Sequence, residues 1–160
     1  MARVMGAPPT RATIWASSAT AVQVLESGAI GEPRSLRLKI VLGTKDGWEI
    51  PFERWSWRFD PAQGGGGRIM LDYGSHFFAI ALYFLGEVEK VFSWISHTTI
   101  QHDSTIDAPA MVMWKYAGAE KYGSFEVVQS DEMLVRSDYV PEDEWFEITG
   151  SRSFIWINRC

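Results

Sequence analysis

Cysteine is almost absent from this sequence. The only one among the 160 residues is Cys160, which excludes a disulfide framework or a thiolate metal site within one chain. The N-terminus also lacks the charged and then apolar pattern of a secretion signal. Both absences favour a reducing compartment, and we expect a cytoplasmic protein. A secreted protein without disulfides would have the same cysteine content and is the alternative.

Long runs of one residue class are missing as well. No basic run exceeds two residues, and 20 acidic residues against 15 basic ones give a net charge of −5, which excludes the electrostatic pattern of a nucleic-acid-binding protein. The longest apolar stretch, Phe77 to Leu85, is far shorter than the ~20 residues of a membrane-spanning helix. We therefore expect neither nucleic acid nor a membrane as a partner.

What is present is a globular composition rich in aromatic residues. Hydrophobic residues make up 46% of the chain, and the aromatic fraction of 14% includes 8 Trp. The length fits one domain with a sizeable core over residues 1–160. Residues 1–11, with two adjacent prolines, predict an irregular N-terminal segment.

Apolar periodicity predicts two helices and a series of strands. The helices are expected over residues 13–27 and 68–85, the second of them apolar almost all round and therefore buried. The strands are expected over residues 33–42, 88–99, 110–116 paired with 122–129, and 144–148 paired with 154–158. Residues 43–67 show no periodicity and are expected to form a long loop. The fold class is α+β, a mainly antiparallel sheet with helices packed on one face.

A sheet covered on one face leaves its other face open to solvent. If the surplus Trp, Phe and Met side chains lie on that open face, they predict a surface for self-association, most simply a homodimer. The alternative is that the same side chains belong to the core.

One segment combines glycines with two titratable side chains. Gly64 to Gly67 precede the predicted helix 68–85, on which Asp72 and His76 lie four residues apart and hence on one face. Such a pair can relay a proton, because the imidazole accepts it and the carboxylate stabilises the resulting imidazolium. A buried, purely structural Asp–His hydrogen bond is the alternative.

Other residues near this pair suggest a ligand site. Gly66 and Gly67 allow a tight turn and a close backbone approach to a ligand, and Gly74 inside the helix indicates a close neighbour, either a ligand or another helix. Trp57 and Arg58 offer an indole face and up to five hydrogen-bond donors to a sugar-like ligand. An ordinary surface loop explains these two residues equally well.

No metal site is predicted. The spacing of His97, His102, Asp103 and Asp107 matches no standard metal site, and a solvated loop explains these residues better. The acidic stretch from Pro141 to Glu144 is expected to form a solvated turn.

Three blocks of sequence share their order and spacing with a known family of domains. They run from Leu25 to Pro33 before a strand, from Trp57 through the glycines and Asp72-Tyr73-Gly74-Ser75-His76 to Gly86, and from Ile106 to Ala110 and on to Phe146-Glu147-Ile148-Thr149-Gly150-Ser151. In this order they resemble the C-terminal domain of the glucose–fructose oxidoreductase / inositol dehydrogenase / MocA (Gfo/Idh/MocA) family. The resemblance covers residues 12–158, and its middle block is the most specific.

The resemblance implies a function. Members of this family are NAD(P)-dependent oxidoreductases of sugars, inositols and related polyols, built from an N-terminal nucleotide-binding domain and a C-terminal α+β domain that often assembles through its sheet. Carried over to this sequence, the catalytic pair is Asp72 and His76, the substrate-binding residues are Trp57, Arg58 and Tyr73, and Asp107 has a structural role.

The sequence also departs from the family pattern. It has neither a Gly-x-Gly-x-x-Gly turn after a strand nor a Glu-Lys-Pro motif, Ala79 stands where an acidic residue often follows the histidine, and the chain ends soon after Ile157. We therefore expect this chain alone to bind no cofactor, although NAD or NADP is implied for the parent enzyme. The predicted function is that of a substrate-binding and oligomerisation domain, inactive alone. The alternative is a non-catalytic dimerising module that retains the fold.

Overall fold

The computed structural model describes six stretches of the chain. They are residues 20–44, 52–54, 56–65, 68–99, 104–135 and 142–158. Several predictions fall outside them: the irregular segment 1–11, the first part of the helix 13–27, Gly66, Gly67, His102 and Asp103.

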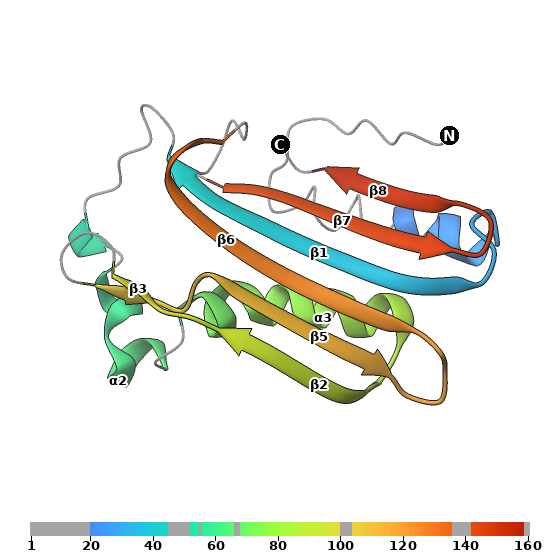
Figure 1. The fold of residues 1–160 in the computed structure, drawn as a ribbon, viewed down its shortest axis with the longest axis horizontal. Coiled ribbons are helices and arrows are strands. Elements are labelled where there is room, and N and C mark those ends of the chain that lie inside the picture. Colours follow the sequence, from blue (N-terminus) through green and yellow to red (C-terminus); the bar gives the residue numbers. More distant parts are fainter. Residues whose placement is uncertain are drawn as a thin grey trace.

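The centre of the fold is a 6-stranded sheet. Its order is β2-β5-β6-β1-β7-β8, and helix α3 (Gly74–Leu85) lies against one face of it (Figure 1). The strands are Pro33–Thr44 (β1), Val88–Ile95 (β2), Ala110–Tyr116 (β5), Tyr122–Leu134 (β6), Glu142–Gly150 (β7) and Phe154–Asn158 (β8). The predicted α+β class, with a mainly antiparallel sheet, is confirmed.

Both predicted hairpins are present. β5 pairs antiparallel with β6, with Val112 opposite Phe125, and β7 pairs antiparallel with β8, with Ile148 opposite Ile155. Strand β1 joins the two hairpins, because it pairs antiparallel with β7 and parallel with β6. The sheet is therefore mixed at this one position.

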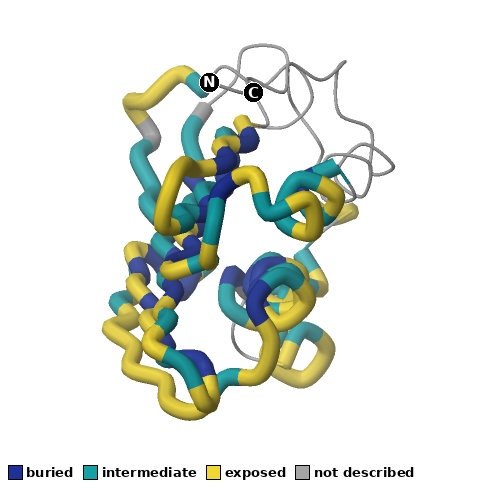
Figure 2. Tube along the Cα trace, turned by 90° about the vertical axis from the view of Figure 1, so that its right-hand side faces the viewer, coloured by how far each residue is buried: buried dark blue, intermediate teal, exposed yellow. Residues whose placement is uncertain are grey.

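Helix α3 (Gly74–Leu85) builds the core with the inner face of the sheet. The ring of Phe77 stacks on that of Phe125 in β6 with centroids 4.6 Å apart, and it meets the ring of Phe146 in β7 at 5.7 Å. Figure 2, which views the molecule from the side, shows the buried residues gathered where the sheet faces the helices.

The predicted helix over residues 68–85 is divided and is covered on one side only. Its first part, η3 (Arg68–Tyr73), is a π-helix, and only α3 is α-helical. On the side away from the sheet, Leu71, Leu82 and Tyr83 have 55%, 50% and 61% of their surface exposed. The prediction of burial all round is therefore wrong for this chain.

The segment expected to be a long loop contains three short helical turns. They are η1 (Phe52–Arg54), η2 (Ser56–Phe59) and α2 (Pro61–Gly64). Turns of three or four residues show no apolar period, so periodicity does not detect them. The sequence nevertheless marks α2, because Asp60 caps its N-terminus and a proline occupies its first position.

The strand expected over residues 88–99 ends early. After β2 the Ser96 N–H donates a hydrogen bond to the Pro109 carbonyl oxygen (3.0 Å), which binds the chain to the segment before β5. Thr98–Thr99 (β3) then pairs with Thr105–Ile106 (β4) in a separate two-stranded sheet.

The acidic stretch before Trp145 is not the solvated turn that its composition suggests. Glu142 and Glu144 are strand residues with 6% and 3% of their surface exposed. Successive side chains of a strand point to opposite faces, so both glutamates share the inner face with Phe146 and Ile148. Strand pairing with β1 therefore overrides the polar composition.

Candidate functional site

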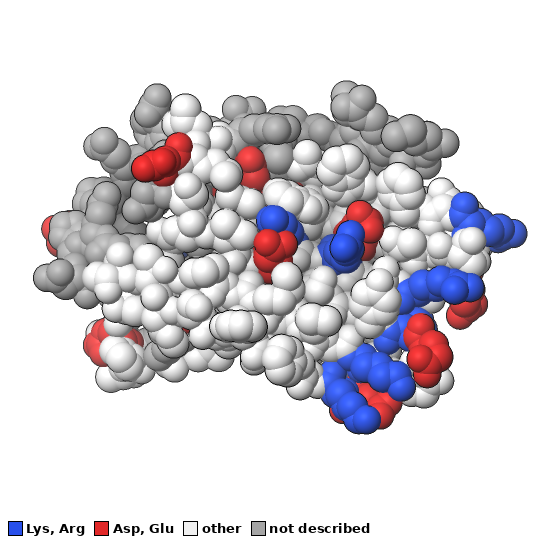
Figure 3. All heavy atoms as spheres, viewed as in Figure 1, with Lys and Arg blue, Asp and Glu red and all other residues white. Residues whose placement is uncertain are grey.

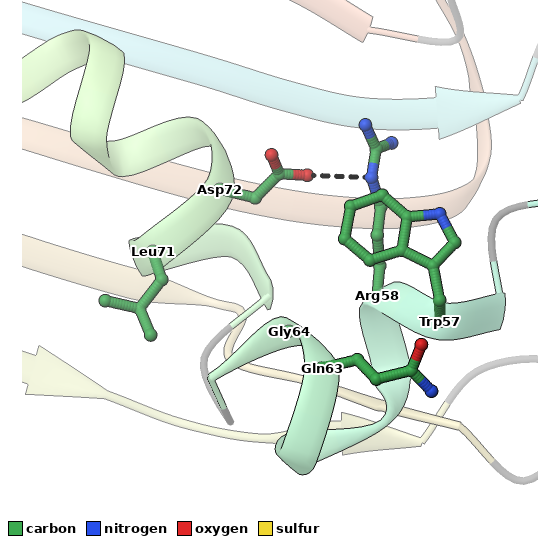
Figure 4. A pocket seen from close by; sticks show the side chains of 6 residues that line it. All are labelled: Trp57, Arg58, Gln63, Gly64, Leu71 and Asp72. Atoms are coloured by element: carbon green, nitrogen blue, oxygen red, sulfur yellow. Dashed lines mark ion pairs between the residues drawn. The ribbon is translucent and has the colours of Figure 1, made fainter.

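A small pocket lies where the short helical turns meet η3 (Figure 4). Its lining residues are Trp57, Arg58, Gln63, Gly64, Leu71 and Asp72, and its volume is about 220 Å³. Sites for drug-sized ligands have volumes of about 300–1,000 Å³. This pocket therefore encloses only part of a ligand of that size.

Arg58 and Asp72 form the charged wall of the pocket. Arg58 Nε lies 3.2 Å from Asp72 Oδ2, and the two side chains are 32% and 35% exposed. The Nε–H is not aimed well enough at this oxygen for a hydrogen bond, so the contact is an ion pair. The guanidinium also lies over the Trp57 ring, 5.2 Å from its centroid. One contact on its edge and one on its face thus restrict the orientation of Arg58.

Asp60 positions the turn that carries the pocket residues Gln63 and Gly64. Its Oδ2 accepts a hydrogen bond from the Gln63 side-chain amide (2.6 Å), and its Oδ1 accepts one from the Ala62 N–H (3.0 Å). The bond from Gln63 and then that from Ala62 lower the pKa of the Asp60 carboxyl, because both favour its ionised form. The charged cap keeps α2 in place below Arg58.

Gly64 lets α2 pack directly on η2. A Cβ atom at this position would lie 2.6 Å from the Arg58 carbonyl oxygen, which is too close for any side chain. The predicted need for glycine in this run therefore has a steric cause at Gly64, where the close neighbour is the backbone of η2.

Asp107 fixes the start of η3. Its surface is 5% exposed, and its two carboxylate oxygens accept hydrogen bonds from the Ile69 N–H (2.5 Å) and the Met70 N–H (2.8 Å). The first N–H groups of a helical segment have no partner within the segment itself. Asp107 is therefore a buried cap and not part of a solvated loop, and through η3 it sets the position of Asp72.

His76 does not line the pocket. It is exposed on α3, and within the described residues no hydrogen bond or ion pair joins it to Asp72, whose charged partner is Arg58. The predicted placement of Asp72 and His76 on one helix face assumes one continuous α-helix over residues 68–85. The hydrogen bonds of a π-helix span five residues, so the four-residue spacing does not carry across the junction after Tyr73.

Tyr73 and Gly74 are placed on the core side. Tyr73 is partly buried against the core cluster. Gly74 is buried, and a Cβ atom there would lie 3.1 Å from the Phe78 ring and 3.7 Å from the Phe125 ring on β6. The close neighbours predicted at Gly74 are therefore the sheet and a side chain of its own helix.

The structure brings together three of the predicted site residues: Trp57, Arg58 and Asp72. Sequence reasoning missed Gln63 and Leu71. The capping pattern of Asp60 and Pro61 marks the turn that carries Gln63, whereas Leu71 shows no feature that separates it from a core residue.

Metal ligands and membrane spans are absent from the parts of the chain that the structure describes. No group of three or more His, Cys, Asp or Glu side chains in these parts could hold a metal ion. None of the helices found there is long and apolar enough to cross a membrane.

Comparison with family models identifies the domain. The model described as GFO/IDH/MocA C-terminal domain matches residues 18–155. This chain belongs to that family. The resemblance carried by the three sequence blocks is thereby confirmed.

Solved dehydrogenase structures share the fold of this GFO/IDH/MocA domain. A levoglucosan dehydrogenase in complex with NADH and levoglucosan is 26% identical, with a TM-score of 0.65, and the match covers 89% of this chain and 37% of the other. The WlbA dehydrogenase from Bordetella pertussis, in complex with NADH and UDP-GlcNAcA, is 14% identical, with a TM-score of 0.60 over 88% and 39% of the two chains. GenD2 from gentamicin A biosynthesis, in complex with NAD, is 16% identical, with a TM-score of 0.59 over 89% and 35%.

This chain thus spans a little over a third of the length of these structures. None of the curated protein sequences compared with it matches.

Proposed function

We propose that this GFO/IDH/MocA domain is the substrate-binding part of an NAD(P)-dependent oxidoreductase that acts on a sugar, an inositol or a related polyol. The family match and the likeness to levoglucosan dehydrogenase support the proposal. The working enzyme also contains a nucleotide-binding domain, and the chain alone is inactive. Its single cysteine fits a cytoplasmic enzyme.

The observation that carries the proposal is the open side of α3 and its pocket. Leu71 lines the pocket and is exposed, and Leu82 and Tyr83 extend the exposed apolar surface along α3. Large apolar side chains beside a pocket too small to enclose a ligand indicate a surface that a second domain covers. The substrate then lies between the two domains.

The described residues do not fit a dinucleotide site. Such a site needs a strand, a glycine-rich turn and a helix whose N-terminus faces the pyrophosphate. Helix α3 follows the π-helix η3, and its N-cap residue is Tyr73. We therefore assign the nicotinamide chemistry to the second domain and no cofactor to this chain alone.

In this proposal Asp72 and His76 handle the proton of the substrate hydroxyl. His76, exposed on α3, would accept the hydroxyl proton while the hydride on the same carbon passes to the nicotinamide that the second domain would hold, so that the alcohol becomes a carbonyl. Asp72, on the preceding π-helix η3, supplies a negative charge and holds Arg58. Trp57 and Arg58 contact the substrate, and Tyr73 supports this wall from the core side.

A fusion protein tests this function. We would join the chain to the nucleotide-binding domain of levoglucosan dehydrogenase and follow NADH formation with a panel of sugars and inositols. At least one compound should turn over, and His76→Asn should lower kcat by about 100-fold or more, the usual contribution of a general base.

His97→Asn is the matched control, because His97 is an exposed histidine outside the site. A fusion that binds NADH but oxidises no member of the panel would contradict the proposal. In a separate titration, the isolated chain should show no saturable binding of NADH or NADPH.

A second candidate function is self-association through the open face of the sheet. Figure 3 shows that charged groups are sparse over most of this face. Phe92 and Trp94 lie opposite Met113 and Met111 in the strand register, and the two aromatic side chains are 67% and 73% exposed. Trp156, 54% exposed on β8, adds an apolar side chain at the opposite edge of the sheet. A second copy of the chain is the partner that we propose, as a dimer.

Sedimentation of the purified chain tests the dimer. Trp94→Glu should convert the dimer to a monomer, because it places a charge in the proposed interface. Tyr83→Glu is the matched control, since Tyr83 is 61% exposed on the opposite side of the sheet. A wild-type chain that stays monomeric would end this proposal. An inactive fusion that still dimerises would favour the non-catalytic module.

A further inference from the structure

The contacts of Arg58 leave one edge of its guanidinium open. Nε faces Asp72, and the plane of the group lies on Trp57. The two terminal nitrogens carry four N–H groups, and these have no hydrogen-bond partner in the described stretches. Figure 4 shows these nitrogens at the end of Arg58 that points away from Gln63 and Gly64, with Asp72 to one side at Nε.

We propose that Arg58 determines substrate specificity by binding a carboxylate, so that the substrate is a sugar acid or a related hydroxy acid. This rests on the proposed function, because it names the substrate class of the same site. The open edge presents two parallel N–H donors in a plane, and this geometry matches the two oxygens of a carboxylate.

The charges at the pocket agree with an anionic ligand on this edge. Arg58 is the only cation and Asp72 the only anion among the lining residues. Asp72 sits at Nε, so a carboxylate bound to the terminal nitrogens is nearer to the guanidinium than to Asp72. The attraction of the carboxylate to the guanidinium and its repulsion by Asp72 both weaken with distance. The nearer, positive charge therefore dominates.

The orientation of Arg58 also reduces the cost of binding. A free arginine loses rotamer freedom when a ligand fixes it. Here the ion pair with Asp72 and the ring of Trp57 already restrict the side chain before any ligand arrives. An uncharged pair of neighbouring hydroxyls could use the same donors, but it would lack the attraction between two full opposite charges.

A matched pair of compounds separates these two ligand classes. We would titrate the 15N-labelled chain with D-glucuronate and with D-glucuronamide, which has the same shape without the charge. Glucuronate should shift the Arg58 Nε–H and Trp57 indole resonances and bind at least about tenfold more tightly than the amide. Added salt should weaken this preference.

Variants assign the preference to Arg58. Arg58→Gln should abolish the difference between the two compounds, and Arg58→Lys should retain only part of it, because lysine keeps the charge but not the planar pair of donors. Arg37→Gln on the far face of the sheet is the control and should leave both affinities unchanged. Far-UV circular dichroism confirms that each variant is folded.

Two outcomes would overturn the inference. Equal affinity for glucuronate and glucuronamide would assign the site to uncharged polyols and leave the proposed function standing. The absence of any shift at Arg58 with either compound at tens of millimolar would remove its role in binding. Failure of the proposed function itself has a different readout, the absence of NADH formation by the fusion with every compound.

Discussion

Tyr116 is the buried polar residue that connects the sheet to α3. Tyr116 is 1% exposed, and its hydroxyl donates a hydrogen bond to the Ala81 carbonyl oxygen (3.2 Å). Burial raises the pKa of Tyr116 to about 12, and the nearby Trp114 indole acts in the opposite direction without making a hydrogen bond of ordinary geometry. The folded state therefore keeps the phenol neutral where an unfolded chain would ionise it.

This difference predicts a loss of stability at alkaline pH. The contribution is complete below about pH 10, the pKa of an unfolded tyrosine, and is lost as the pH rises through the folded-state pKa of about 12. Tyr116→Phe should remove this pH dependence and cost about 1 kcal/mol at neutral pH through the lost hydrogen bond.

Urea unfolding at a series of pH values measures both effects. Tyr122→Phe is the control, because Tyr122 is 56% exposed. An alkaline loss of equal size in wild type and Tyr116→Phe would show that another group causes it.

Asp107 gives a second prediction for a single residue. Asp107→Asn keeps the size of the side chain but replaces one acceptor oxygen by a donor, which faces either the Ile69 or the Met70 N–H. We expect a loss of about 1–3 kcal/mol in the free energy of unfolding. The amide resonances of the two residues should shift, and so should that of the Arg58 Nε–H.

Glu53→Gln, an exposed change in η1, serves as the control for Asp107→Asn. An Asp107→Asn variant with an unchanged Arg58 resonance would show that Asp107 stabilises η3 without positioning Asp72.

At the scale of the elements, the contact between α2 and η2 determines the shape of the pocket. Gly64→Ala would place a methyl group 2.6 Å from the Arg58 carbonyl oxygen, and the two turns must move apart. We expect a cost of about 1–3 kcal/mol, as for other overpacked sites, and a weaker contact between Arg58 and Trp57. The indole resonance of Trp57 reports this change, and Ala62→Ser on exposed α2 is the control.

Elements specified by nearby residues were predictable from the sequence. The hairpins over β5–β6 and β7–β8 follow from alternating side chains and short turns, and both are present. The parallel pairing of β1 with β6 joins distant segments and leaves no local pattern. The same holds for η3, whose cap Asp107 lies 38 residues from Ile69.

Part of the candidate site was predictable for the same reason. Trp57 and Arg58 lie next to each other in sequence and stack in the structure. The predicted pairing of Asp72 with His76 assumes a regular helix. The structure has a π-helix here, and Asp72 pairs with Arg58 from η2. Residue spacing predicts which side chains share a face only in a regular helix, so the prediction fails where the site contains a π-helix.

At the scale of the whole molecule, the two exposed apolar surfaces differ from the core in their expected sensitivity to mutation. Leu82→Lys and Tyr83→Lys change exposed side chains of α3, so each should alter the stability of the isolated chain by no more than about 0.5 kcal/mol. Phe77→Ala removes a ring of α3 that packs against rings on β6 and β7, and it should lower the free energy of unfolding by about 3–5 kcal/mol.

Urea unfolding of the isolated chain compares the three variants, and NADH formation by the fusion gives the second readout. The two lysine variants should impair the fusion although they leave the isolated chain stable. Full activity of both in the fusion would show that α3 does not meet the nucleotide-binding domain.

The place of β1 between β6 and β7 bears on how the domain forms during translation. Lys39 on β1 contacts Glu126 on β6, 87 residues later, and Leu36 lies opposite Ile148 on β7. A ribosome that makes this polypeptide releases β1 long before either neighbouring strand exists. The nascent domain therefore carries an apolar strand with open backbone groups until its last hairpin emerges, and it is a natural client for chaperones throughout that interval.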